Sequence, residues 1–390
     1  MPAKTPAPVH PVHDALHQAR RIVWAENDTL IDDAGHRLID MFSANGAALL
    51  GHAHPKIAAA IKAQLDGVWL TGGLLTPAYD LAKTALESFL PPGLGLAGLY
   101  STGMEAAEFA MRMARVHTGR SDFVGFSCAM HGKSAATAAL SWANAPPLAH
   151  IHRLPEPGRC SELQVIEQLE QCLRDHSVAA VFVEPVMGTG GGYVISADFY
   201  GQLIALCQAH GSLLVMDEIL SGFYRTGPRF AFLSLPVHPD LVLLGKALAN
   251  AFPASAVVAR RDIRCTPAML PGSTYAGNPL AAAAIAATLD ELRRLNVSAM
   301  VAAIATTIKA GLADVPGLVL RGRGALWMIE LASPQRASEM AKALYARGVF
   351  ASFTGNYLRL LPSATIKPEN LQRACQTLRD LLQEQEATRV

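Results

Sequence analysis

Charged residues are scarce in this sequence, and neither sign is in excess. Asp, Glu, Lys and Arg together make up 17% of the 390 residues, and the formal net charge is +1 at pH 7. Because a nucleic-acid-binding surface needs a clear excess of basic side chains, this balance argues against a nucleic-acid partner. Apolar residues make up 51% of the chain, and so apolar a sequence with so few charges indicates an oligomer with an extensive subunit interface.

Cysteine is also sparse, and no C-x-x-C pair occurs among the six cysteines. The chain is much longer than the domains that disulfides hold together, so we expect free thiols in a reducing compartment. The first residues, Met1–Leu16, contain no apolar core of the kind that a signal peptide needs. These absences together predict a cytoplasmic protein.

No apolar stretch is long enough to predict a membrane span. The longest uncharged stretch, Cys265–Leu289, is interrupted by prolines and glycines. The 13 histidines include no H-E-x-x-H motif and no other spacing that indicates metal ligands. The sequence therefore predicts neither a membrane partner nor a metal site.

Two short apolar runs, each followed by a chemically reactive residue, lie near the middle of the chain. Leu213–Met216 is followed directly by Asp217, and Leu241–Leu244 is followed by Gly245 and Lys246. A run of four apolar residues bounded by polar or turn residues fits a strand buried on both faces, as in a parallel sheet. Because ligands bind beyond the carboxyl ends of such strands, we expect Asp217 and Lys246 to face one crevice.

These two residue types together suit the chemistry of pyridoxal phosphate (PLP). Burial disfavours the ammonium form, so a lysine just beyond a buried strand can lose its proton and attack an aldehyde to form a Schiff base. A nearby carboxylate can keep a pyridine nitrogen protonated, which makes PLP an electron sink. Taken singly, however, Asp217 is better explained as a loop cap and Lys246 as a solvated side chain.

A third pattern is typical of a phosphate site. The expected buried strand Leu96–Tyr100 is followed by Ser101–Glu108, which opens an amphipathic helix. The amides of a first helical turn have no partners inside the helix, and the helix dipole is positive there, so an anion can bind. An ordinary helix capped by Ser or Thr remains the alternative.

Elsewhere the pattern predicts alternating helices and strands that end in a small α+β unit. Ala15–Trp24 fits a short helix, Leu30–Asp40 fits a hairpin, and Ala256–Ala259 fits a strand. Within the apolar strand Leu358–Leu361 lies Arg359. A buried guanidinium needs an anionic partner, and both a substrate carboxylate and a structural salt bridge are compatible with this residue type.

Several motifs together resemble the class III PLP-dependent aminotransferases, over roughly Trp24–Leu382. They are L-G-H-A-H-P at 50–55, E-P-V-M-G at 184–188, D-E-I-L-S-G-F-Y-R-T-G at 217–227, G-K-A-L-A-N-A-F-P at 245–253 and T-Y-A-G-N-P at 274–279. The resemblance implies an α/β fold, fold type I of the PLP enzymes. That fold has a mostly parallel seven-stranded sheet in a large domain and a smaller α+β domain built from both chain ends. The implied division is 58–286 for the large PLP-binding domain, with 1–57 and 287–390 forming the small domain.

The resemblance also implies a role for individual residues. Lys246 would form the Schiff base and Asp217 would face the pyridine nitrogen, while an amino group moves from an amine or amino acid to an aldehyde or keto acid. Arg359 would bind a substrate carboxylate, and Thr274 would reach the cofactor of the neighbouring subunit in a homodimer. The other residues implied to contact PLP are Thr102, Gly103, Met104, Met130, His131, Gly132, Glu184 and Ile219.

Three positions depart from the usual residues of the family. Met104 stands where Ser or Thr is usual, Met130 replaces an aromatic ring that stacks on the cofactor, and Leu220 stands where many members have Gln. These departures keep two alternatives open. One is a PLP-dependent racemase, epimerase or decarboxylase on the same fold. The other is a non-catalytic relative, although the presence of both Asp217 and Lys246 counts against it.

Overall fold

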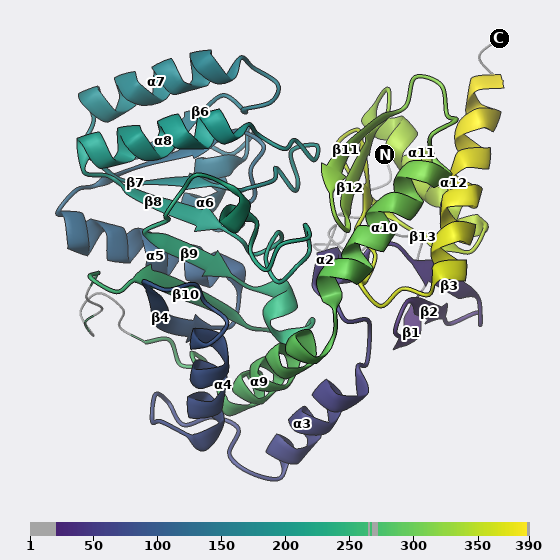
Figure 1. Cartoon of the computed structure of the whole chain (residues 1–390), viewed down its shortest axis with the longest axis horizontal. Coiled ribbons are helices and arrows are strands. Elements are labelled where there is room, and N and C mark those ends of the chain that lie inside the picture. Colours follow the sequence, from purple (N-terminus) through teal and green to yellow (C-terminus); the bar gives the residue numbers. More distant parts are fainter. Residues whose placement is uncertain (1–20, 264–265, 267–271, 388–390) are drawn as a thin grey trace, which may run out of the picture.

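A seven-stranded sheet forms the centre of the larger of two domains (Figure 1). The computed structural model describes residues 21–263, 266 and 272–387. The strand order is β4-β10-β9-β8-β7-β5-β6; neighbours from β9 to β6 run parallel, whereas β10 is antiparallel to β4 and β9. The strands are β4 (Leu94–Tyr100), β5 (Asp122–Phe126), β6 (Ile151–Leu154), β7 (Val178–Val183), β8 (Leu213–Asp217), β9 (Leu241–Leu244) and β10 (Ser255–Arg260).

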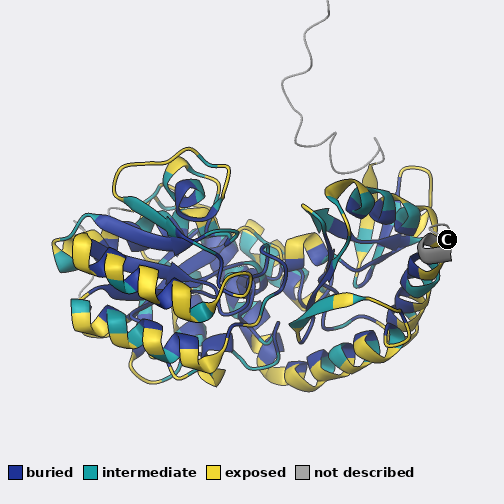
Figure 2. Cartoon of the chain, turned by 90° about the horizontal axis from the view of Figure 1, so that it is seen from above, coloured by how far each residue is buried: buried dark blue, intermediate teal, exposed yellow. Residues whose placement is uncertain are grey.

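Helices cover both faces of this sheet, which explains why its strands are apolar throughout. In β8, Leu214 and Met216 belong to the apolar cluster that includes α7 (Glu162–Asp175) and α8 (Ala197–His210). The alternate residues of β8 join the cluster on the other face, with α5 (Gly103–Thr118) and α6 (Ala135–Ser141). Successive side chains of a strand point to opposite faces, so a doubly covered strand needs an unbroken apolar run. Figure 2 shows these strands buried and the outer helix faces exposed.

The two apolar runs singled out in the sequence are adjacent strands of this sheet. β8 and β9 pair in parallel, with Asp217 opposite Leu243. The α/β fold with a mostly parallel seven-stranded sheet and a smaller domain is therefore confirmed. The expected strand at 256–259 is β10, whose antiparallel direction the sequence pattern did not reveal.

The smaller domain is built from both chain ends. Its first sheet has the order β1-β2-β3-β13, and β13, from the C-terminal part, pairs in parallel with β3. Its second sheet has the order β11-β12-β15-β14. The elements are β1 (Ile22–Glu26), β2 (Thr29–Asp32), β3 (Arg37–Asp40), α10 (Val297–Gly311), β11 (Val319–Arg323), β12 (Leu326–Glu330), α11 (Pro334–Ala346), β13 (Val349–Phe350), β14 (Ser352–Thr354), β15 (Tyr357–Leu360) and α12 (Pro368–Ala387).

One helix prediction is wrong where the structure describes it. The pattern at 15–24 favoured a helix, but Ile22–Glu26 forms β1, which pairs antiparallel with β2. The pairing strand, which a local pattern cannot supply, decides the conformation of this segment. The hairpin predicted from Leu30 to Asp40 is confirmed as β2 and β3.

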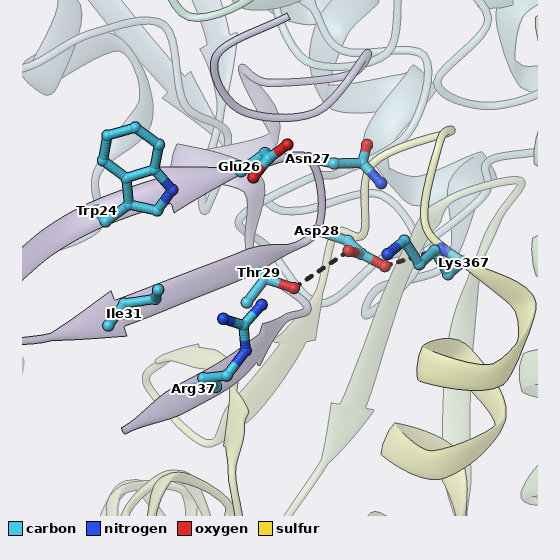
Figure 3. A pocket seen from close by; sticks show the side chains of 8 residues that line it. All are labelled: Trp24, Glu26, Asn27, Asp28, Thr29, Ile31, Arg37 and Lys367. Atoms are coloured by element: carbon cyan, nitrogen blue, oxygen red, sulfur yellow. Dashed lines mark hydrogen bonds between the residues drawn. The ribbon is translucent and has the colours of Figure 1, made fainter. Parts of the chain in front are cut away.

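A small hollow of about 160 Å³ lies between the first sheet and the start of α12 (Figure 3). Its lining side chains are Trp24, Glu26, Asn27, Asp28, Thr29, Ile31, Arg37 and Lys367. The buried Asp28 carboxylate accepts hydrogen bonds from the backbone N–H of Lys367 at 2.8 Å and from Asn370 Nδ2 at 2.9 Å. Through these bonds Asp28, which lies between β1 and β2, holds the start of α12.

Helix α9 (Pro279–Arg294) leads from the large domain to the small one and packs on α3 (Pro55–Leu65) and α4 (Pro77–Glu87). The predicted domain boundaries at 57/58 and 286/287 fall inside α3 and α9, and they stay a prediction. In the described ranges, no helix has a stretch that is both long and apolar enough to cross a membrane.

Candidate active site

Three ionisable side chains lie where adjacent strands of the large sheet end. Glu184 directly follows β7, Asp217 is the last residue of β8, and Lys246 follows β9 after Gly245. These strands are neighbours and run parallel, so their carboxyl ends share one edge of the sheet. This edge is where ligands bind in open α/β sheets.

Two hydrogen bonds hold the Asp217 carboxylate. His131 Nδ1 lies 2.8 Å from Asp217 Oδ2, and the N–H of Ile219 donates to Asp217 Oδ1 at 3.0 Å. Asp217 and His131 are only 3% and 1% exposed. An ionised carboxylate only accepts hydrogen bonds, so His131 donates from Nδ1, and its Nε2 is buried without a hydrogen-bond partner among the described residues.

Lys246 opens the short 3-10 helix η2 (Lys246–Ala249) with a φ of +46°. A side chain in this left-handed region costs about 1–3 kcal/mol, and such residues cluster at functional sites. Burial, followed by the positive charge of Arg359, lowers the pKa of Lys246 below its ordinary value of 10.5, against the opposing effects of Asp217 and Glu184. This amine therefore loses its proton more easily than an exposed lysine does.

Glu184 connects this edge to the loop that follows β5. Burial and the charge of Asp217 raise the pKa of Glu184, and its Oε2 accepts a hydrogen bond from the N–H of Met130 at 3.1 Å. The Met130 side chain is fixed in turn by Trp142, whose indole Nε1 lies 3.4 Å from Met130 Sδ. Trp142 directly follows α6, and the sequence pattern gave no reason to place it here.

The amino end of α5 packs against Ile219. Thr102 caps the helix: its Oγ1 accepts from the N–H of Glu105 at 3.2 Å, and its carbonyl accepts from Ser255 Oγ at 2.6 Å. A Cβ on Gly103 would lie 2.6 Å from Ile219 Cδ1, so a larger residue cannot stand there without displacing Ile219. The start of α5, whose first amides have no partner within the helix itself, is thus fixed beside the Asp217 segment.

Gly132 and Met104 join the same group of residues. A Cβ on Gly132, which has a φ of +146°, would lie 2.5 Å from Thr137 Oγ1 and 2.9 Å from Met104 Cγ. The loop that carries His131 therefore passes against the first turn of α5. The residues assigned from sequence in the loop after β5, at the start of α5, at the end of β8 and just beyond β7 and β9 are thus brought together.

Arg359, in β15, reaches this group from the smaller domain. Its side chain is nearly fully buried, and burial lowers its pKa to about 10. Nη1 donates to Asn45 Oδ1 at 2.9 Å, whereas Nε has no hydrogen-bond partner in the described part of the chain. The negative charge of Glu184 acts in the opposite direction and raises the pKa of Arg359, so these two side chains interact electrostatically. Among the described residues, Arg359 forms no salt bridge, so the structural alternative is not realised.

Asn45 is presented by a left-handed turn, α2 (Ser43–Gly46). The φ angles of Ser43, Ala44 and Asn45 are +48°, +51° and +61°. Residues with a Cβ rarely adopt this conformation in succession. Asp40 stabilises the entry to the turn, because its Oδ1 accepts from the N–H of Phe42 at 2.8 Å and of Ser43 at 3.0 Å.

Arg225 holds the two domains together beside this site. Its side chain is fully buried, and all three acceptors are backbone carbonyls. Nη1 donates to Ala325 O at 3.1 Å and Pro362 O at 2.5 Å, and Nη2 donates to Gly46 O at 2.9 Å. Arg225 is the arginine of the F-Y-R-T-G motif, and its interdomain role could not be read from the motif alone.

Asn250 is a second residue whose role the sequence did not reveal. Its side-chain oxygen accepts from the N–H of Leu50 at 2.7 Å, and its amide donates to Gly51 O at 2.9 Å. These bonds fasten the L-G-H-A-H-P segment to the turn that begins at Lys246. An asparagine in a turn is common, so only the three-dimensional contact distinguishes this one.

Two further residues discussed from sequence, Thr274 and Leu220, have different surroundings. Thr274 is exposed on the loop before α9. Leu220 is buried, and a Cβ on Gly188 would lie 2.4 Å from Leu220 Cδ2. It packs in an apolar cluster with Val186, Leu326, Met328, Tyr357 and Leu361. The apolar character of Leu220 therefore serves packing between the two domains.

This α/β fold, with a buried lysine, carboxylates and an arginine converging from two domains, defines an enzyme that acts on a small molecule. The family model Aminotransferase class-III matches residues 12–382. The chain therefore belongs to the class III aminotransferases, a family that depends on PLP, and it is a transaminase.

Individual relatives agree with this conclusion. The chain is 33% identical to 2-aminoadipate transaminase of Pseudomonas putida, with 96% of this chain and 97% of that protein covered. It is 32% identical to LysW-aminoadipate semialdehyde/glutamate semialdehyde transaminase of Sulfolobus acidocaldarius, with 92% and 94% covered. A transaminase structure from the marine bacterium Virgibacillus matches with a TM-score of 0.87 over 98% of both chains at 22% identity, which supports the fold. These relatives favour transamination over racemisation or decarboxylation.

Proposed function

We propose that this transaminase moves an amino group between an amine or amino acid donor and an aldehyde or keto acid acceptor, using PLP attached to Lys246. One observation carries the proposal: Asp217 ends β8, Lys246 follows the adjacent parallel strand β9, and His131 Nδ1 lies 2.8 Å from Asp217 Oδ2. The alternative reactions, racemisation and decarboxylation, were suggested by three residues that depart from the usual family pattern, Met104, Met130 and Leu220. One of them, Leu220, now has a packing role.

The residues at this edge fit PLP. The bonds from His131 and Ile219 use two of the roughly four acceptor positions of the Asp217 carboxylate, which leaves room for a pyridinium N–H. The glycine at Gly103 keeps the start of α5 close to Ile219, and a helix N-terminus suits a phosphate group. Lys246 supplies an amine whose pKa is lowered.

PLP bound there would act as an electron sink for the substrate carbanion. The Lys246 amine removes the proton from the substrate α-carbon and later donates it, a task that needs a base with a pKa not far above neutrality. The Asp217 carboxylate would face the pyridine nitrogen of the bound cofactor. His131 fixes the orientation of that carboxylate, and Met130, fixed by Trp142, takes the place of a stacking ring.

Arg359 is the proposed binding group for a substrate carboxylate. Its support is the buried guanidinium with an unpartnered Nε and a neutral acceptor, Asn45, on Nη1. The relative from Pseudomonas putida is a 2-aminoadipate transaminase, and 2-aminoadipate bears carboxylates. Arg359→Gln should raise KM for an α-amino acid roughly 10–100-fold, since hydrogen bonds to charged groups contribute about 1.5–3 kcal/mol. The matched substrate is the corresponding amine without the carboxylate. An equal rise in KM for the amino acid and for this amine would contradict the role of Arg359.

A homodimer in the cytoplasm completes the proposal, with Thr274 reaching the cofactor of the neighbouring subunit. The homodimer is supported by a group of exposed apolar side chains. Trp69 is 58% exposed, and Leu74 and Leu75 are each 75% exposed. The described cysteines are free thiols, which suits a reducing compartment; Cys265 lies outside the described residues. Light scattering should give twice the chain mass, and Thr274→Ala should weaken PLP retention without dissociating the dimer.

The decisive experiment is a screen of amino donors against the PLP-loaded enzyme without an acceptor. We expect a donor to convert the bound cofactor to its amino form and to release one equivalent of keto product. Release of no keto product from any donor, together with loss of substrate stereochemistry or of CO₂, would instead assign racemisation or decarboxylation. Borohydride reduction followed by peptide mapping should find the cofactor on Lys246.

A further inference from the structure

Soft metal-ligating side chains gather at the amino edge of the large sheet, opposite the active site. His152 lies in β6, Cys172 lies in α7, and His176 directly follows α7. One nitrogen of each imidazole and Cys172 Sγ all lie within 4.8 Å of one another. We infer that these three side chains bind a divalent transition-metal ion of the Zn²⁺ class, independently of the amino-transfer chemistry proposed above.

The donor set selects the class of ion. Thiolate and imidazole ligands favour Zn²⁺ and similar ions over Mg²⁺ and Ca²⁺, which prefer oxygen. Zinc holds sulfur at about 2.3 Å and nitrogen at about 2.0–2.1 Å, which sets neighbouring donors roughly 3.3–3.8 Å apart in a tetrahedral site. The observed grouping therefore needs a contraction of only about 1 Å. His176 caps the end of α7, and its backbone N–H donates to Cys172 O at 3.1 Å, which keeps the two residues together.

Asp122, the first residue of β5, orients the site. Its Oδ2 lies 2.8 Å from His152 Nε2 and 3.8 Å from His176 Nδ1, and its Oδ1 lies 2.8 Å from His150 Nδ1. A carboxylate hydrogen-bonded to a ligand histidine fixes the ring and raises its basicity, an arrangement that recurs around protein-bound metals. One ligand histidine, His152, is therefore already held by a carboxylate that does not itself belong to the three ligands.

An ion can reach these ligands from solvent. The His152 and His176 side chains are 24% and 43% exposed, and their rings stack with centroids 3.9 Å apart. His176 lies at the surface end of α7, so its ring can turn until the in-plane lone pair of a nitrogen points at an ion shared with His152 and Cys172. Cys172 lies beneath them, and its thiol proton passes to solvent when the metal binds. The bound ion would tie β6, the edge strand of the sheet, to the end of α7.

The sequence predicted no metal site because these ligands do not form a contiguous motif. The C-x-x-x-H pair in α7 is too short a signal, and His152 comes from a strand placed beside it by the fold. Only the parallel pairing of β5 with both β6 and β7 brings Asp122 and His152 to the end of α7.

The test is a metal titration of the full chain loaded with PLP. Calorimetry with Zn²⁺ should show one ion per chain at this site, and Co²⁺ difference spectra should show a thiolate-to-cobalt charge-transfer band. Cys172→Ser should abolish that band, and His176→Ala should weaken binding at least tenfold. Cys160→Ser and His238→Ala, which replace exposed residues outside the cluster, are matched controls and should bind as the wild type does.

A second readout separates binding from folding. His176 is exposed, so His176→Ala should keep the Tm of the wild type without metal, while added Zn²⁺ should raise the Tm of the wild type only. Absence of Zn²⁺ binding by the wild type would overturn the inference. So would a charge-transfer band that persists in Cys172→Ser, or an affinity that His176→Ala leaves unchanged. None of these readouts measures transaminase turnover, so they test the metal site separately from the proposed function.

Discussion

The two edges of the seven-stranded sheet handle charge in opposite ways. At the amino edge, charged groups are paired: Asp240 Oδ2 accepts from the N–H of Leu214 at 2.7 Å, and Arg260 pairs with both Asp240 and Asp262. At the carboxyl edge, Lys246 and Glu184 are buried with shifted pKa values. Charges that are fully paired stabilise a fold, whereas buried charges held short of full pairing are available to a ligand.

Left-handed backbone is more frequent at the carboxyl edge, although His150, directly before β6 at the amino edge, also has a φ of +66°. Beyond the carboxyl ends of the strands, Cys128, Phe223, Tyr224, Lys246 and Asn250 all have φ between +45° and +71°. Such conformations persist only when surrounding contacts enforce them, and they aim side chains that a regular turn would not. The comparison therefore assigns stability to one edge and chemistry to the other, and each of the following changes tests that division.

The largest effect is expected from Lys246→Ala. Loss of the proton-transferring amine alone should lower kcat/KM by at least about 10²–10⁴-fold, and the loss of cofactor attachment adds to this. The free energy of unfolding should not fall, because a buried amine opposes folding. Lys342→Ala, which replaces an exposed lysine on α11, is the control. Retention of turnover by the Lys246 variant would remove the basis of the proposed function.

Arg225→Met should cause the largest loss of stability. Its removal leaves the buried carbonyls of Gly46, Ala325 and Pro362 without their donor, at about 1–3 kcal/mol each, and the relief of burying a guanidinium offsets part of this. We expect the free energy of unfolding to fall by about 2–4 kcal/mol in urea titrations. A value near zero would show that the arginine does not join the two domains.

A smaller effect on catalysis is expected from His131→Ala. The hydrogen bond from His131 Nδ1 to the Asp217 carboxylate, at 2.8 Å, involves a charged group. Such bonds contribute about 1.5–3 kcal/mol, so kcat should fall roughly 10–100-fold. His131→Asn retains a donor at nearly the same position and should recover most of the loss. The pH dependence of the cofactor absorbance should also move in the alanine variant, which a merely structural role would not produce.

The pH dependence of PLP attachment tests the charge balance around Lys246. Only the neutral amine attacks the aldehyde, and burial and Arg359 lower its pKa from 10.5, so the rate should rise with pH through a midpoint below 10.5. Arg359→Gln removes the second of these causes and should raise the midpoint, which slows attachment a few-fold at neutral pH. Stopped-flow absorbance of apoenzyme mixed with PLP measures the rate, with Arg323→Gln as control. A midpoint that stays or falls in the Arg359 variant would contradict the assigned electrostatics.

Much of the fold could be predicted because its signals are local. The apolar runs of β8 and β9 read as doubly buried strands, and the polar residues that end them marked the ligand edge. The direction of β10 and the strand conformation of Ile22–Glu26 could not be predicted, because pairing with distant segments decides both. Local propensity is a weak guide wherever tertiary pairing competes with it.

The candidate site divides in the same way. Lys246 and Asp217 were visible as reactive residues at strand ends, whereas Asn45 was not, since its left-handed turn is stabilised by Asp40 and by packing of both domains. Trp142 was hidden because its contact with Met130 depends on how α6 returns to the loop after β5. Residues that act through another residue leave little trace in a pattern, because their spacing is set by the fold.

The smallest effect, and the one that sharpens the comparison most, is expected from Arg120→Met at the amino edge. Arg120 Nη1, like the guanidinium of Arg225, binds backbone acceptors from different segments: Val178 O at 3.2 Å and His210 O at 2.5 Å. Arg120 is only partly buried, however, so water can replace its lost bonds. We expect a loss of about 1 kcal/mol in the free energy of unfolding and an unchanged kcat/KM. A fall in kcat/KM with native stability would show that the amino edge also shapes the chemistry, and the division between the edges would then fail.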